Sequence, residues 1–290
     1  MEEQTIGYLG PKGTFTKMAV DALFDGGNFI SYESIPACLD AVEEGEITTG
    51  VVPLENAIEG SVHLTIDYLV HYVNQSIIAE MTVPIKQHLL VHSQYNGEKI
   101  ERIYSHSQAI AQCHQYLHKN FPGIKIEYTT STAKAAEIAA SSGPKVAAIG
   151  NHLAAERNQL KILEDNIHDY DNNHTRFAVV QKNPKTLKVK DHPHKQKTTV
   201  MITLPQDYVG ALHQVLAAFA WRKMNLSKIE SRPLKTGLGN YYFIIDVEQA
   251  YDQIMFPGVK AELEALGCQM KLLGTYPSYQ ISLHTPVKKA

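Results

Sequence analysis

The chain has 290 residues, of which 44% are hydrophobic and 20% are charged, so it can bury one large core or two. A formal net charge of -3 and a pI near 6.5 argue against a general role in binding nucleic acid or membrane surfaces. Cys38, Cys113 and Cys268 are far apart and lack any CxxC spacing, which supports neither a disulfide framework nor a zinc site. Because no apolar run approaches membrane-spanning length either, we expect a soluble, cytoplasmic protein of two units.

Residues 1–183 alternate between short apolar runs and runs with helical spacing, which is the pattern of an α/β fold. We expect residues 77–90 to be an extended crossover, since Pro84 disfavours a central position in a sheet. Residues 165–173 are expected to carry the chain from the second lobe back to the first. The pattern therefore predicts two lobes of periplasmic-binding type (type II), lobe one at about 1–82 and 166–183 and lobe two at about 83–165.

Polar residues follow several of the expected strands. Residues 10–16 form a glycine turn before a helix, which exposes backbone N–H groups to an anion but lacks the nucleotide-binding fingerprints. Glu55 and Asn56 fall at the carboxyl end of a strand, where ligands bind in open α/β sheets. The alternative for the following Glu59 and Ser61 is an ordinary capping role. If the lobes close on one another, the strand ends at 10–16, 54–61, 105–108 and 174–177 face one cleft.

The polar run from Asn172 to Arg176 passes directly into the apolar residues 177–180. Such a loop holds its last polar side chains firmly and leaves them reachable. The hydroxyl of Thr175 donates and accepts hydrogen bonds, and Arg176 forks onto carboxylates, so the pair suits an acidic substrate that carries a hydroxyl. The alternative is a simple turn at Asn172 followed by a solvated strand arginine.

A lysine-rich segment with two prolines, residues 184–196, is interpreted as a solvated linker. The residues beyond it, 197–280, predict strand, helix, strand, strand, helix and strand, which is the ferredoxin-like βαββαβ plan. Taken without further motifs, this unit would be read as a self-contained stabilising domain.

Several separate motifs together resemble those of the bacterial prephenate dehydratase family along nearly the whole chain. They are residues 10–16 (the opening glycine motif), 53–61 (PIENSxEGS), 105–109 (SHPQAL), 174–177 (the catalytic TRF signature), and 210–213 and 230–233 (the GAL and ESRP motifs of a phenylalanine-binding ACT domain). Ala57 in place of a serine and Ser107 in place of a proline depart from the family pattern. Since nothing resembling the helical chorismate mutase extension precedes these motifs, we expect a monofunctional enzyme.

The resemblance implies loss of CO2 and water from prephenate to give phenylpyruvate, driven by aromatisation and requiring no cofactor or metal. Thr175 is then expected to donate a hydrogen bond to the leaving hydroxyl. A protonated Glu55, or a relay behind Thr175, is the alternative source of the proton. We expect Asn56, Gln108 and Ser105 to orient the substrate.

The same resemblance assigns further residues to substrate binding. Arg176 is expected to hold a carboxylate, although a structural role stays open, and Phe177 is expected to line the ring pocket. Thr14 and Ala57 are also expected near the substrate.

The ACT-like part implies feedback inhibition by phenylalanine in a homodimer or homotetramer. Effector contacts are expected from Gly210, Ala211, Leu212, Asn225, Leu226, Glu230, Ser231 and Arg232. Two other functions remain open: an arogenate dehydratase, which would carry the same motifs, and a non-catalytic two-lobed solute-binding protein fused to an amino-acid sensor.

Overall fold

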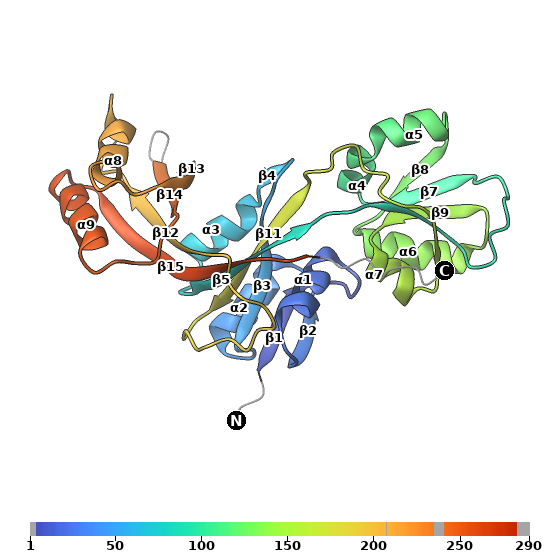
Figure 1. Ribbon diagram of the computed structural model, residues 1–290, viewed down its shortest axis with the longest axis horizontal. Coiled ribbons are helices and arrows are strands. Elements are labelled where there is room, and N and C mark those ends of the chain that lie inside the picture. Colours follow the sequence, from blue (N-terminus) through green and yellow to red (C-terminus); the bar gives the residue numbers. More distant parts are fainter. Residues whose placement is uncertain (1–3, 207, 235–240, 283–290) are drawn as a thin grey trace.

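The computed structural model describes residues 4–206, 208–234 and 241–282. Three groups of elements follow one another along the longest axis of the molecule (Figure 1). Lobe one lies in the middle, lobe two lies at one end, and the C-terminal ACT-like part lies at the other end. The predicted fold class, a two-lobed α/β region with a ferredoxin-like part, is confirmed.

Lobe one is a sheet in the order β2-β1-β3-β11-β5 with helices on its faces. Its elements are β1 (Thr5–Leu9), α1 (Phe15–Leu23), β2 (Asn28–Tyr32), α2 (Ile35–Glu44), β3 (Thr49–Asn56), β4 (Gly60–Ser61), α3 (His63–His71), β5 (Ser76–Pro84) and β11 (His174–Gln181). The local sequence fixes the helix starts, since Thr14 caps α1 and Ser34 caps α2 by accepting from backbone N–H groups.

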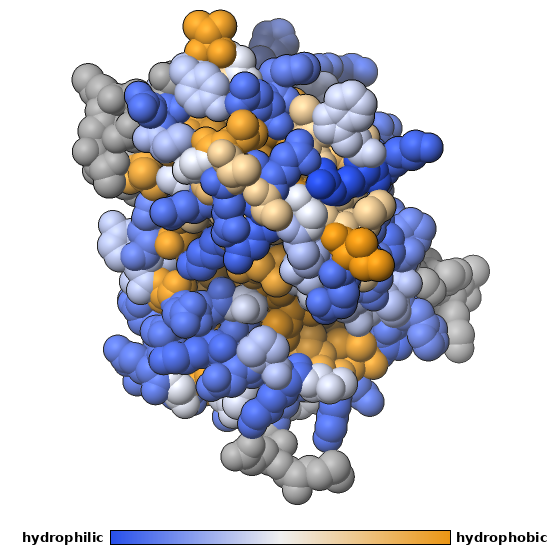
Figure 2. Space-filling model, turned by 90° about the vertical axis from the view of Figure 1, so that its left-hand side faces the viewer, coloured by the Kyte–Doolittle hydropathy of each residue, from blue (hydrophilic) through white to orange (hydrophobic). Residues whose placement is uncertain are grey.

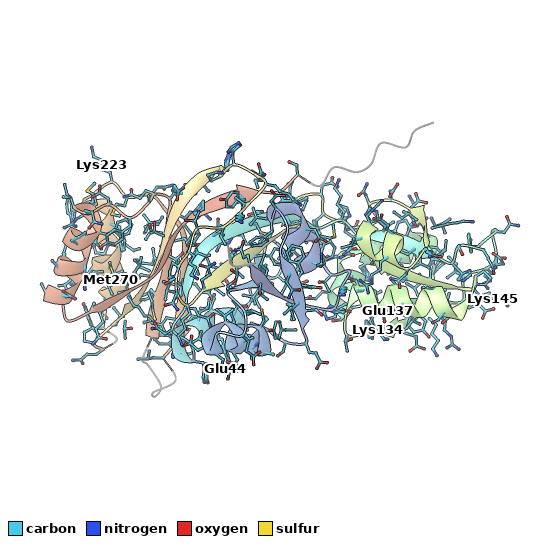
Figure 3. All side chains as sticks on the ribbon, turned by 90° about the horizontal axis from the view of Figure 1, so that it is seen from below. Glu44, Lys134, Glu137, Lys145, Lys223 and Met270 are labelled. Atoms are coloured by element: carbon cyan, nitrogen blue, oxygen red, sulfur yellow. The ribbon has the colours of Figure 1, made fainter. Side chains whose placement is uncertain are left out.

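Lobe two is a smaller sheet in the order β10-β6-β9-β7-β8. Its elements are β6 (His88–Val91), β7 (Arg102–Ser105), α4 (Ser107–Gln112), α5 (His114–Asn120), β8 (Lys125–Tyr128), α6 (Thr132–Ser142), β9 (Val146–Gly150), α7 (His152–Arg157) and β10 (Lys161–Glu164). Four of the alanines of α6 are buried against this sheet, whereas its Lys134 and Glu137 form an ion pair on the outer surface (Figure 3). Small residues on the inner face let the helix lie close to the sheet.

Two antiparallel segments connect the lobes. The backbone N–H of Ile85 donates to the carbonyl of Asn173, and that of Ile167 donates to the carbonyl of Gln87, both at 2.8 Å. The expected crossover at 77–90 is shorter than predicted, because its first part is strand β5, which pairs with β11. Pro84 is the last residue of β5, so its missing N–H leaves the ladder inside the sheet intact.

The C-terminal part follows the predicted βαββαβ order. It comprises β12 (Lys195–Thr203), α8 (Ala211–Ala220), β13 (Leu226–Pro233), β14 (Tyr241–Val247), α9 (Met255–Ala265) and β15 (Gln269–Gln280). Seen from this end of the molecule, apolar side chains are interspersed with charged ones (Figure 2), and the exposed apolar residues of this part include Val209, Trp221 and Ile254.

The C-terminal sheet and the sheet of lobe one are continuous. Strand β15 pairs in parallel with β5, with Ser278 opposite Glu80, and the joined sheet has ten strands. The expected linker is also attached, since Leu187 and Val189 pack against the core of lobe one. The seam between the two parts, where β5 and β11 meet β12, β14 and β15, is therefore a built interface rather than a loose connection.

Candidate active site

A cleft of about 650 Å³ lies between the two lobes. The strand ends singled out in the sequence reach it from lobe one, and helix starts reach it from lobe two. The lining includes Thr14, Pro53, Asn56, Glu59, Thr175 and Phe177 from lobe one, and His106, Gln108, Gln112, Ser131 and Thr132 from lobe two. The structure thus brings Thr175, Asn56, Gln108, Phe177 and Thr14 together around one space, as the sequence predicted.

Asn56 fixes the hydroxyl of Thr175. The side-chain oxygen of Asn56 accepts from the backbone N–H groups of Ile58 (3.0 Å) and Glu59 (3.1 Å), which sets the orientation of its amide. The amide nitrogen then donates to Oγ1 of Thr175 and to Oδ1 of Asn173, both at 2.9 Å. Since the Thr175 oxygen already accepts this hydrogen bond, its own proton remains to be donated to a ligand in the cleft.

Arg176, which follows Thr175, and Glu55, which precedes Asn56, point to the other side of the sheet. Side chains alternate along β11, so Thr175 and Phe177 line the cleft while Arg176 faces the seam. On β3 the register shifts between the pairs Arg176–Glu55 and Phe177–Pro53, a β-bulge. A bulge re-aims a side chain, and here Asn56 faces the cleft while Glu55 joins Arg176 on the seam.

Arg176 is surrounded by protein carboxylates and does not line the cleft, where the sequence analysis expected it to hold a carboxylate of the substrate. Its Nη1 lies 2.8 Å from Oδ2 of Asp246 with hydrogen-bond geometry. Glu80 (3.2 Å) and Glu55 (3.1 Å) form ion pairs with it that lack such geometry. Burial alone would lower the pKa of Arg176, but these carboxylates outweigh burial and raise the pKa above its usual value. The open alternative, a structural role, fits this position.

Glu55 lies on the seam as well, which corrects its expected place beside the substrate. Its carboxylate pairs with Arg176 and, at 3.2 Å, with Nζ of Lys228 on β13. The β-bulge sets the direction of the Glu55 side chain, and no local sequence pattern predicts that bulge. A relay of protons from Glu55 to the cleft finds no support in these contacts.

Among the described residues that line the cleft there is no lysine or arginine. Two helices of opposite lobes instead begin there, α1 after Thr14 and α6 after Ser131. Free backbone N–H groups and the helix dipole favour an anion at such ends. The cleft can therefore hold a negatively charged ligand without a cationic side chain.

Two side-chain amides of lobe two reach across the cleft to a carboxylate of lobe one. Nε2 of Gln108 and, at 3.2 Å, Nε2 of Gln112 both donate to the carboxylate of Glu59, which comes from the opposite lobe. Gln112 also accepts from Nε2 of Gln87 at 3.4 Å. Sequence reasoning named Gln108 but missed Gln112, although a spacing of four residues places both on one face of a helix.

Three other predicted residues take supporting positions. Ser105 is fully buried, and its hydroxyl donates to the carbonyl of Ile149 at 2.7 Å, so it does not line the cleft. Ala57 is exposed beside the cleft, and its backbone N–H donates to the carbonyl of His174. Thr14 lines the cleft and caps α1, which ties its side chain to the helix start.

The expected effector residues form two groups. Gly210, with a φ of +90° that favours glycine, begins α8, followed by buried Ala211 and exposed Leu212. Asn225 precedes β13 and donates to Glu248 at 2.7 Å.

Strand β13 carries the second group and alternates in exposure. Leu226 packs beside the C-terminal core and Ser231 is exposed. Glu230 accepts from Ser61, and Arg232 donates to Asp67 at 2.8 Å, so both contact lobe one. In this structure the two charged residues of the ESRP motif therefore contact lobe one, and Ser231 does not.

Within the described ranges, no group of three or more His, Cys, Asp or Glu side chains is arranged to hold a metal ion. The described helices are likewise all too short or too polar to cross a membrane.

The family model for prephenate dehydratase matches residues 6–185. A prephenate dehydratase of Bacillus subtilis is 52% identical over 287 residues, which cover 95% of this chain and 99% of that relative. A solved prephenate dehydratase from Staphylococcus aureus has a TM-score of 0.81 at 30% identity and covers 94% of this chain and 100% of its own. The enzyme from Arthrobacter aurescens, solved in complex with L-Phe, has a TM-score of 0.80 at 32% identity and covers 97% of this chain and 93% of its own. With these matches and the motif residues gathered around one cleft, the chain belongs to the prephenate dehydratase family.

Proposed function

We propose that this chain converts prephenate into phenylpyruvate in the cleft between its lobes, as an enzyme of phenylalanine biosynthesis. Family membership supports the reaction, and the observation that carries the site is the Asn56–Thr175 hydrogen bond. It leaves the hydroxyl proton of Thr175 available inside the cleft.

The chemistry needs few groups from the protein. As the ring carboxylate leaves as CO2, its bonding electrons move into the ring and expel the hydroxyl from the opposite ring carbon. This hydroxyl leaves as water, and the proton that it gains is supplied in the net reaction by solvent. Thr175 donates a hydrogen bond to this departing oxygen; because threonine is a weak acid, it shares its proton rather than surrendering it. Asn56 keeps the hydroxyl aimed, and buried Phe177 lines the ring site.

Substrate binding is assigned to the cleft groups rather than to Arg176. The starts of α1 and α6 offer backbone N–H groups to the two carboxylates of prephenate. Gln108 donates to the substrate in place of Glu59, with which it is paired here. Closure of the lobes excludes water and strengthens these interactions.

The C-terminal part is proposed to bind phenylalanine and to inhibit the enzyme. Support comes from the Arthrobacter aurescens relative, which was solved with L-Phe. The site is placed at the start of α8, where Leu212 and Val209 are exposed. Glu230 and Arg232 on β13 connect this part to lobe one.

Assembly and boundaries are also proposals. Pairing of C-terminal parts in a homodimer or homotetramer would cover exposed apolar residues such as Val209 and Trp221. The catalytic region is assigned to residues 1–183, the linker to 184–196 and the ACT-like domain to 197–280. Because β15 pairs with β5, the last of these is joined to lobe one by its final strand.

The test is phenylpyruvate formation from prephenate by the purified protein, with arogenate as parallel substrate and phenylalanine added to half of the reactions. We expect turnover of prephenate that phenylalanine suppresses. Preference for arogenate would make the chain an arogenate dehydratase. Ligand-induced closure without turnover of either compound would favour the solute-binding alternative.

A further inference from the structure

A buried carboxylate from the C-terminal part reaches the strand that carries Thr175. The side chain of Asp246 on β14 is 2% exposed, and its Oδ2 lies 2.8 Å from Nη1 of Arg176 on β11. The two residues are 70 positions apart in the chain. Asp246 therefore contacts the residue that directly follows Thr175.

The charges around Arg176 are shared unequally. Glu80 also pairs with Lys197 at 2.6 Å, and Glu55 also pairs with Lys228 at 3.2 Å. Asp246 instead takes its second hydrogen bond from the neutral hydroxyl of Thr199, at 2.7 Å. Within the part of the chain that the structure describes, Asp246 alone of the three carboxylates has no ion pair with a lysine, and it alone has hydrogen-bond geometry to Arg176. Without its charge the buried guanidinium loses its best-oriented partner.

Asp246 is itself firmly attached to the C-terminal sheet. The hydroxyl of Thr199, which donates to it, also lies 2.6 Å from the hydroxyl of the buried Tyr276. These residues come from β12 and β15, which flank each other in the sheet. The position of Asp246 is therefore set by the C-terminal part and not by lobe one.

Lobe one is irregular where this contact is made. The register between β11 and β3 shifts between Arg176 and Phe177, immediately after Thr175. The bulge disrupts the ladder to β3, so β11 is held less completely on that side, whereas its register with β5 is unbroken there. An anchored side chain at Arg176 compensates on the opposite face of the strand, and small displacements of a catalytic group cost much rate.

We propose that Asp246 is a positioning residue, which acts through Arg176 to hold the hydroxyl of Thr175 in its working position. The inference rests on the proposed function, because it concerns the same reaction. In this proposal the ion pair between Asp246 and Arg176 connects the C-terminal part directly to β11, the strand that carries Thr175.

The test compares Asp246→Asn, which keeps size and loses charge, with Glu262→Gln in the full-length enzyme. Glu262 pairs with Arg222 at 2.7 Å inside the C-terminal part, away from β11, and so is a control for the loss of one ion-paired carboxylate, although it is more exposed than Asp246. We expect Asp246→Asn to lower kcat for prephenate about tenfold with KM within about twofold, and Glu262→Gln to change neither by more than about twofold. Equal kcat values for the two variants would overturn the inference.

A double-mutant cycle tells action through Arg176 from general damage. If Asp246 acts through Arg176, the variant Arg176→Gln with Asp246→Asn has a kcat no lower than Arg176→Gln alone. If the two substitutions instead lowered kcat independently, so that their fold-losses multiplied, the inference would be overturned.

A second variant serves if circular dichroism shows that Asp246→Asn is unfolded. Thr199→Val keeps the charges of both Asp246 and Arg176 and is expected to lower kcat about threefold at unchanged KM, and an unchanged kcat would refute the proposal. A wild type without prephenate turnover would remove the proposed function and this inference together.

Discussion

The two faces of the strand pair β3 and β11 differ sharply in charge. The cleft face presents a hydroxyl, amides and apolar groups from Thr175, Asn56 and Phe177. The seam face, one residue away, presents Arg176 and Glu55 within a buried ion network. Adjacent residues of one signature thus serve different tasks, because side chains alternate across a sheet and a bulge shifts the alternation on β3.

The difference follows from what each face must bind. A substrate with two carboxylates brings its own charge, and backbone N–H groups at helix starts hold it without desolvating a cationic side chain. The seam is closed on both sides by protein, so each charge there needs a partner within the chain. Each face therefore makes its own prediction under mutation.

The largest effect is expected on the cleft face. Thr175→Ala removes the hydrogen-bond donor to the leaving hydroxyl and should lower kcat by about 100-fold or more, with little change in KM. Steady-state kinetics on prephenate measures both, and Thr175→Ser, which keeps a hydroxyl, should retain much of the rate. An unchanged kcat in Thr175→Ala would remove Thr175 from the mechanism.

On the seam face the main effect is expected on stability. Arg176→Met leaves the carboxylates of Glu55, Glu80 and Asp246 without a shared cation and should reduce the free energy of unfolding by about 3–5 kcal/mol, with KM nearly unchanged. Denaturant unfolding measures the change.

The control for this seam variant is Lys182→Met. It breaks a surface pair with Glu43 and should cost less than about 1 kcal/mol. If Arg176→Met instead raised KM strongly while leaving stability unaffected, Arg176 would belong to the substrate site after all.

A smaller effect on stability is expected when the pH is lowered and Asp246 becomes protonated. Burial would raise the pKa of Asp246, but Arg176 and the hydrogen bond from Thr199 hold this pKa below its usual value. A carboxyl with a lowered pKa in the folded state contributes stability that is present above its unfolded pKa of about 3.9 and is lost as the pH falls through the folded value.

The free energy of unfolding should therefore differ between wild type and Asp246→Asn by on the order of 1–3 kcal/mol from pH 8 to pH 5, and the difference should shrink below about pH 4. Unfolding curves across this range measure it. A difference that grew on acidification would show that Asp246 is not held as an anion in the fold.

Local sequence signals determined much of this protein. The alternation of apolar runs indicated two α/β lobes and a βαββαβ unit, and the short polar side chains of Thr14 and Ser34 cap α1 and α2 through contacts within a few residues. Turn-prone polar residues at strand ends marked the residues that line the cleft, such as Asn56 and Thr175. These features depend on the nearest few residues, so they can be read from the sequence.

Only the tertiary structure decided which way the signature residues face. The bulge that turns Glu55 away from the cleft depends on the pairing of β3 with β11, and the partners of Arg176 come from β5 and β14, far away in the chain. The central place of β5 likewise depends on β15, which arrives near the end of the described chain. Such contacts have no local periodicity, because they arise from the packing of segments that meet only after the chain has folded.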